Sequence, residues 1–253
     1  MEVVLVVVIA LAVVGLAVWA HQQEKKRVAS LVAWGRQVSM TLLAERLPDP
    51  AWPYGLFQRG HSRYAQVVLR CDWPQATPGL GAGHMVMFEY HYAVTTGSGK
   101  NRRTHHYWHT CALVDLSLQV GHVSVEREGL GDKLAAVFGF DDLDFEDAEF
   151  SKRFKVQAET KKDAWTLLDG AMMRWWKDHA ECRLETRGRE ALVVLESSGK
   201  ASAERFLALK EWTTGFLAQM PRVLVNAERT RQGLPPIVEA GNASMQSRAE
   251  RSE

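Results

Sequence analysis

The strongest pattern along the chain is an unbroken apolar run over residues 3–20, followed at once by a polar and basic segment, residues 21–27. As a helix, the run would rise about 27 Å, close to the hydrocarbon thickness of a bilayer. Trp19 stands where an aromatic side chain anchors a helix at the membrane interface. We therefore predict a transmembrane anchor over residues 1–21, with residues 3–20 in contact with the membrane.

The charges that flank the run predict its orientation. Lys25, Lys26 and Arg27 follow it closely, and no basic residue precedes it. By the positive-inside tendency, the part of the chain after the anchor stays in the cytoplasm. The sequence thus predicts a single-pass protein of the cell membrane with a cytoplasmic C-terminal domain.

A cleaved signal peptide is the alternative interpretation of the same run. Val18 and Ala20 could serve as the small residues before a cleavage point, and the domain would then be exported with His21 at its N-terminus. Two features argue against cleavage. The chain begins Met1-Glu2, without the basic segment of a secretory signal, and the run exceeds the roughly 7–15 apolar residues of a signal core.

Helical spacing continues after the anchor. Apolar residues recur three and four positions apart over residues 24–47, and Pro48 and Pro50 end the pattern. We predict a juxtamembrane helix over residues 22–47 that packs on its own domain. A helix lying on the membrane surface is the less favoured alternative, because the polar face is not strongly basic.

Alternation of apolar and polar residues then predicts strands at 64–73, 85–95, 103–115, 119–126 and 150–157. Residues 85–95 and 103–115 flank a Gly-containing turn and form the clearest predicted hairpin. Its core face is expected to carry the following side chains: Val86, Phe88, Tyr90, Tyr92 and Val94 on one strand, matched by Trp108, Ala112 and Val114 on the other.

In the second half of the chain, the sequence pattern predicts mostly helices. They are expected at 130–138, at 161–168 with Thr160 as its cap, and onward to about His179. Residues 182–186 and 191–196 are expected to pair as a second hairpin. A last helix should cover residues 201–229, divided at Pro221. The expected fold is α+β: an antiparallel β-sheet domain over residues 48–230, with about six strands covered by helices, then a disordered tail, 231–253.

Charge balance and cysteine count argue against some classes of partner and of protein. The chain has 31 basic and 30 acidic residues, and this balance argues against a nucleic-acid partner. Its three cysteines are widely separated and odd in number, which does not favour a disulfide framework. A protein partner is compatible with the sequence, and no cofactor is expected.

A histidine-rich segment, residues 84–111, is the main candidate for chemistry. If the predicted hairpin turns near Gly99, five possible metal ligands share the face opposite its core: Glu89, His91, His105, His109 and Cys111. A slip of one residue in one strand would separate them. Because no established metal spacing is matched, a metal-free outer face is the favoured interpretation, and a metal-dependent enzyme or metal-binding protein is the alternative.

Part of the chain resembles a group of uncharacterised, membrane-anchored bacterial proteins. The resemblance rests on a Tyr-rich hairpin, an acidic Phe-Glu…Glu-Phe…Phe-x-Val segment and a two-part helix, and it covers about a third of the chain. The matching segments are Phe88-Glu-Tyr-His-Tyr92, Leu143-Asp-Phe-Glu146, Glu149-Phe-Ser-Lys-Arg-Phe-Lys-Val156 and residues 164–176. It implies a bacterial membrane protein and brings no activity or catalytic residues.

No convergent set of nucleophile, base and oxyanion donors is apparent, and the Gly-x-Ser-x-Gly elbow is absent. No catalytic residue is therefore assigned from the sequence. The favoured function is a membrane-tethered, non-catalytic binding or assembly module that faces the cytoplasm.

Overall fold

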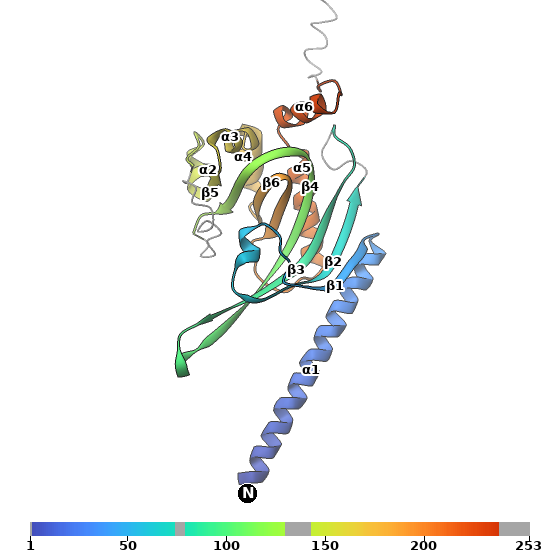
Figure 1. Cartoon of the computed structure of the whole chain (residues 1–253), viewed down its shortest axis with the longest axis vertical. Coiled ribbons are helices and arrows are strands. Elements are labelled where there is room, and N and C mark those ends of the chain that lie inside the picture. The colour runs from blue at the N-terminus through green and yellow to red at the C-terminus, as the bar shows by residue number, and fades with distance from the viewer. Residues whose placement is uncertain (1, 74–78, 130–142, 238–253) are drawn as a thin grey trace, which may run out of the picture.

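The computed structural model describes residues 2–73, 79–129 and 143–237. The predicted helix at 130–138 and most of the predicted tail lie outside these residues. The described chain is an α+β protein, in which one long N-terminal helix is followed by an antiparallel sheet with helices packed on it (Figure 1).

The first helix, α1 (Glu2–Gln37), is continuous. Within the described residues it is the one helix long and apolar enough to cross a membrane. Its apolar half projects away from the domain (Figure 1), and side chains such as Val4 and Leu16 are about two-thirds exposed. Only the other end packs on the domain, where Leu31 and Val32 are buried. The protein therefore leaves the apolar run uncovered, as expected of a membrane anchor.

The helix ends at Gln37, ten residues earlier than predicted. Ser39 has a φ of 60°, and the Met40 N–H donates to the Gly35 carbonyl at 2.8 Å, which closes the last turn. Residues 41–48 form an edge strand, β1 (Thr41–Pro48), instead of continuing the helix. Pairing with the neighbouring strand outweighs the local helical spacing there.

Six antiparallel strands form one sheet. The order is β1-β2-β3-β4-β5, and β6 pairs with the other edge of β4. The strands after β1 are β2 (His61–Trp73), β3 (Gly83–Thr96), β4 (Arg103–Arg127), β5 (Phe154–Ala158) and β6 (Cys182–Leu195). The fold class and the approximate number of strands agree with the sequence prediction.

Two local predictions in this sheet are wrong. The predicted strands 103–115 and 119–126 are one strand, β4, which bends at a bulge where Ser117 has a φ of 57°. The predicted hairpin at 182–196 is also one strand, because β6 follows β4 through the same bend. Gly188, with a φ of 66°, lies where β6 turns. Both errors concern long-range pairing that replaces a local turn.

The helical elements after α1 are short or medium in length. They are η1 (Gly55–Gln58), η2 (Gly99–Asn101), α2 (Ala148–Arg153), α3 (Lys161–Leu167), α4 (Gly170–Asp178), α5 (Ala203–Ala218) and α6 (Arg222–Arg231). Thr160 caps α3 as predicted, and the last helix divides at Pro221. The predicted strand 150–157 is instead helix α2 followed by β5, because Asp147 caps a helical turn by accepting from the Phe150 N–H.

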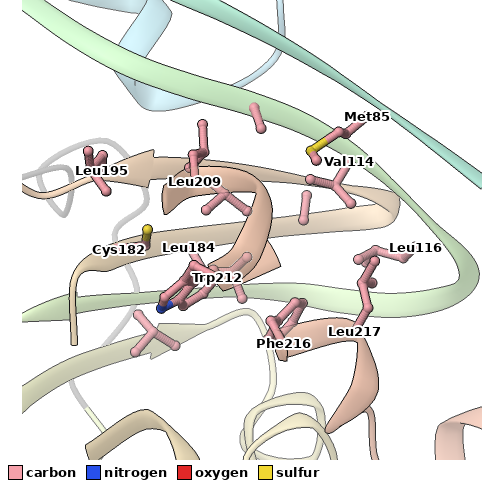
Figure 2. Packing of buried hydrophobic residues seen from close by; sticks show 14 of the residues in the cluster. Met85, Val114, Leu116, Cys182, Leu184, Leu195, Leu209, Trp212, Phe216 and Leu217 are labelled. Atoms are coloured by element: carbon pink, nitrogen blue, oxygen red, sulfur yellow. The ribbon is translucent and has the colours of Figure 1, made fainter. Parts of the chain in front are cut away.

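Both faces of the sheet are covered. On one face, α5 brings Leu209, Trp212 and Phe216 against side chains of β4 and β6, such as Val114 and Leu184 (Figure 2). On the other face an aromatic cluster forms around the η1 segment. Its largest members are Tyr54, Phe57, Phe88, Tyr90 and Tyr92. The sheet is thus the middle layer of the domain.

Candidate functional site

The histidine-rich hairpin does not bring its five possible ligands together. Glu89 pairs with Thr110 and His91 with Trp108, whereas Tyr90 pairs with His109 and Phe88 with Cys111. Paired residues of an antiparallel ladder share a face. Glu89 and His91 therefore lie on one face, and His105, His109 and Cys111 lie on the other, with the tyrosines.

This register differs by one residue from the one that would align the ligands. Trp108, Ala112 and Val114 consequently leave the tyrosine face on which the sequence analysis placed them, and Ala112 and Val114 join the core beneath α5. Among the described residues, no group of three or more His, Cys, Asp or Glu side chains is arranged to hold a metal ion.

His109 and Cys111 are packed as core residues. His109 is 3% exposed and stacks on Tyr92, with ring centroids 5.7 Å apart. Burial, with a smaller contribution from nearby Arg183, lowers the pKa of His109 to about 3, so the imidazole is neutral. Burial also raises the pKa of the Cys111 thiol far above its usual range. A neutral thiol is a poor metal ligand and nucleophile.

The sheet face that carries Glu89 meets the anchor helix, and four charged side chains converge there: Glu24, Arg27, Glu89 and Lys200. Glu89 is 0% exposed. One carboxylate oxygen accepts from Arg27 of α1 at 3.0 Å and from the Gln66 side-chain amide of β2 at 2.5 Å. The other accepts from the Ala201 backbone N–H, just before α5, at 2.5 Å. A single buried carboxylate thus connects α1, the sheet and the start of α5.

A second carboxylate, Glu24, lies one helical turn before Arg27 and extends this network. Glu24 accepts from Arg27 at 2.6 Å, from Lys200 at 2.7 Å and from Gln66 at 3.0 Å. The bond from Arg27, followed by those from Lys200 and Gln66, lowers the pKa of Glu24 to about 2 despite partial burial. Arg27 also donates to the Ala201 carbonyl at 2.7 Å. We call these five residues, Glu24, Arg27, Gln66, Glu89 and Lys200, the junction network.

A β-bulge positions Gln66 in this network. The pairing of β2 with β3 shifts between Gln66 and Leu69, and Val67 has a φ of 52°, which is unusual for a β-branched residue. Val67 and Leu69 pack in the α5-side core, while Ala65 and Val68 join the aromatic cluster on the other face. The bulge lets Gln66 and Val67, which are consecutive, both face α1.

A groove of about 490 Å³ lies beside the network, between α1 and strands β1 and β2. Its lining includes both acidic and basic side chains: Glu24, Lys25, Glu45, Arg46 and Lys200, together with His21. Tyr64 and Gln66 supply hydrogen-bonding groups. The groove opens next to residue 21, where the apolar run of α1 ends, and so lies at the side of the domain from which this run projects.

A row of stacked side chains extends from the groove across β2, β3 and β4. The Arg46 guanidinium lies 3.8 Å from the centroid of the Tyr64 ring, and Tyr64 stacks on His91 at 4.6 Å. His91 then contacts both Trp108, at 5.0 Å, and His106, whose Nδ1 lies 3.0 Å from His91 Nε2. Burial lowers the pKa of His91, which favours the neutral ring in this row.

The chemistry of this region is that of a clamp and a polar binding surface. Its two junction carboxylates, Glu24 and Glu89, are paired with Arg27 and Lys200. Sequence reasoning selected Glu89 and His91 but missed Glu24, Arg27, Gln66 and Lys200. The available signal was the Glu24–Arg27 spacing of three residues directly after the apolar run, which places both side chains on one helix face.

Comparisons with known proteins bear on the fold. No protein-family model and no curated protein matches the chain. A similar solved structure is the crystal structure of the mycobacterial trehalose monomycolate transport factor A, TtfA. The two chains share 11% identity with a TM-score of 0.52, and the match covers 85% of this chain and 97% of that one. At this identity the similarity supports the α+β architecture, with nearly all of the TtfA chain represented in the present one.

Proposed function

We propose that this protein is a non-catalytic accessory module, tethered to a bacterial cell membrane by a single transmembrane helix. The helix holds the α+β domain at a fixed position on the cytoplasmic face, and the domain binds or assembles a partner there. The observation that carries the proposal is the junction network. A flexible tether needs no buried contact, whereas here the fully buried Glu89 connects the anchor helix to the sheet and to α5.

The charge pattern supports the orientation. The basic residues that flank the apolar run lie on the domain side, where the positive-inside tendency expects cytoplasm. The fold similarity adds support of another kind, because the protein of similar structure is described as a transport factor. An accessory role beside other membrane components is compatible with a domain that is joined to its anchor helix by paired charged groups.

Cysteine labelling tests the orientation. The native cysteines, Cys71, Cys111 and Cys182, are buried, so a cysteine introduced at the exposed Ala227 of α6 would be the reactive one. A membrane-impermeant maleimide should label A227C only after the cells are permeabilised. Labelling in intact cells, at the level seen after permeabilisation, would instead indicate an exported domain.

Crosslinking tests the role as an assembly module. Trp165 is 58% exposed on α3, and a photoreactive residue at this position samples what lies against the domain. In native membranes the full-length chain should give a discrete adduct, and this adduct should weaken when Glu89→Gln loosens the clamp. A chain that forms no adduct and migrates as a monomer in mild detergent would contradict the proposal.

A further inference from the structure

The β3–β4 hairpin extends beyond the rest of the sheet. Pairing of β2 with β3 ends at Ala93, and pairing of β6 with β4 begins at Cys111. Residues 94–105, which we call the hairpin tip, therefore form a two-stranded ribbon without a neighbouring strand on either side. Most of its residues are exposed. Apart from Val94, which packs against the aromatic cluster at the base, the tip adds no side chain to the core of the domain, so its sequence is free to serve a contact outside it.

The tip has its own internal order. Thr95 and Thr104 face each other with their hydroxyl oxygens 3.0 Å apart, and Tyr92 stacks on Tyr107 at its base. Gly97, with a φ of 79°, closes the turn near the Asn101 carbonyl, where a Cβ atom would lie 2.4 Å from that oxygen. The ribbon is thus a defined structural element that presents its turn in one direction.

The charge of the tip is uniformly positive. Lys100, Arg102 and Arg103 are exposed, and no acidic residue occurs between Glu89 and Asp115. Within the part of the chain that the structure describes, none of these three cations forms an ion pair with an acidic side chain. Unpaired cations on a projecting turn are suited to an anionic partner.

The direction of the tip bears on what that partner is. Figure 1 shows the hairpin and the apolar half of α1 projecting toward the same end of the molecule, opposite to α6. If α1 enters the bilayer at residue 20, the tip reaches toward the same lipid surface. The buried junction network joins α1 to the domain, and a fixed angle between the two would hold the tip at that surface.

We propose that the hairpin tip is a second membrane contact, in which Lys100, Arg102 and Arg103 bind the anionic headgroups of the leaflet that faces the domain. Each basic side chain near an anionic bilayer favours association by about fivefold. The anchor and the tip together would fix the domain at two points, which restrains both its tilt and its rotation about α1. This inference rests on the proposed anchoring of α1 in the membrane.

The test uses the full-length chain reconstituted in lipid nanodiscs. An environment-sensitive fluorophore is attached to S98C at the turn, or to A227C on α6 at the opposite end as the matched control position. In bilayers that contain phosphatidylglycerol, the fluorophore at position 98 should shift to the blue and be quenched by headgroup-labelled lipid. Both effects should weaken in pure phosphatidylcholine and at high salt. The fluorophore at position 227 should respond to neither.

A pair of charge reversals tests the role of the cations. K100E/R102E should lower the docked-to-free ratio of the tip by more than about tenfold. K161E/K162E on α3 makes the same change in net charge far from the tip and should leave quenching at position 98 unchanged. Equal quenching in both bilayers, or equal effects of the two double variants, would overturn the proposal.

Vesicle flotation separates this proposal from the anchoring on which it rests. A chain that floats with vesicles of either composition but shows no lipid-dependent signal at position 98 is anchored without a tip contact, and only the tip proposal fails. A chain that does not float at all overturns both.

Discussion

Arg27 of the anchor helix lies 3.0 Å from Glu89, a carboxylate that is 0% exposed in the middle of the sheet. This contact spans 62 residues of sequence and joins the long apolar N-terminal helix to the centre of the domain. A carboxylate so deeply buried is tolerated only because each of its oxygens accepts strong hydrogen bonds. We therefore expect this ion pair to set the orientation of the domain relative to α1.

Removal of the Glu89 carboxylate from this pair should lower the free energy of unfolding. Glu89→Ala leaves the Ala201 N–H without its acceptor and removes one acceptor each from Arg27 and Gln66, and we expect a loss of about 3 kcal/mol in the free energy of unfolding. Glu89→Gln should cost less, because an amide keeps one acceptor oxygen. Urea unfolding of the full chain in mild detergent, followed by tryptophan fluorescence, measures both. Glu45→Gln, at an exposed site in the groove, serves as the control and should change stability by less than about 0.5 kcal/mol. A similarly small loss in Glu89→Ala would contradict the clamp.

Stability should fall on mild acidification because of His109. Its pKa is lowered to about 3 in the folded protein by burial and stands near 6.5 when unfolded, so below about pH 6.5 the unfolded state binds the additional proton. The contribution is about 2 kcal/mol lost by pH 5. His109→Gln should flatten this part of the stability profile, whereas His105→Gln, exposed on the same strand, should not. An unchanged slope in His109→Gln would show that other groups dominate.

Gly60 should be intolerant of any side chain. It has a φ of 57° at the start of β2, and a Cβ atom there would lie 2.2 Å from the Ala93 carbonyl oxygen. Gly60→Ala combines backbone strain with a clash against main chain, and we expect a loss of about 2 kcal/mol or more. Gly81→Ala meets nothing within 4 Å and is the matched control. Equal melting temperatures for the two variants would contradict this account.

The helix cap at Asp169 provides a smaller, local test. Its carboxylate accepts from the Ala171 and Met172 N–H groups at 3.0 and 2.8 Å. Asp169→Ala should lower stability by about 1 kcal/mol, whereas Asp169→Asn, which retains a capping oxygen, should lose little. Thermal unfolding of the unaltered protein and the two variants measures the difference. If Asp169→Asn lost as much stability as Asp169→Ala, the carboxylate would have a role beyond capping.

Features set by local sequence were predictable. The apolar run, the hairpin turn around Gly99, the Thr160 cap and the break at Pro221 each depend on neighbouring residues, and each occurs as expected. Features set by distant pairing were not. Residues 41–48 carry a helical spacing but become β1 because β2 offers an edge, and β6 forms one strand because it follows the bend of β4.

The candidate site shows the same division more sharply. The five possible ligands follow from their spacing along the predicted hairpin. Their faces depend on its register, which is one residue away from the predicted one, and this shift alone separates Glu89 from His109. The junction network joins residues 24, 66, 89 and 200, which no local pattern connects. Only the Glu24–Arg27 spacing gave a sequence signal for it.

The most direct test of the clamped anchor is the distance distribution between two spin labels, one at Q22C on α1 and one at E190C on β6, in the full chain in lipid nanodiscs. Both positions are exposed and lie outside the network. Pulsed electron paramagnetic resonance should give a single narrow distribution that broadens in Glu89→Ala and stays narrow in Glu45→Gln. A broad distribution in the unaltered chain, or one that Glu89→Ala leaves unchanged, would show that the domain hangs freely from its anchor.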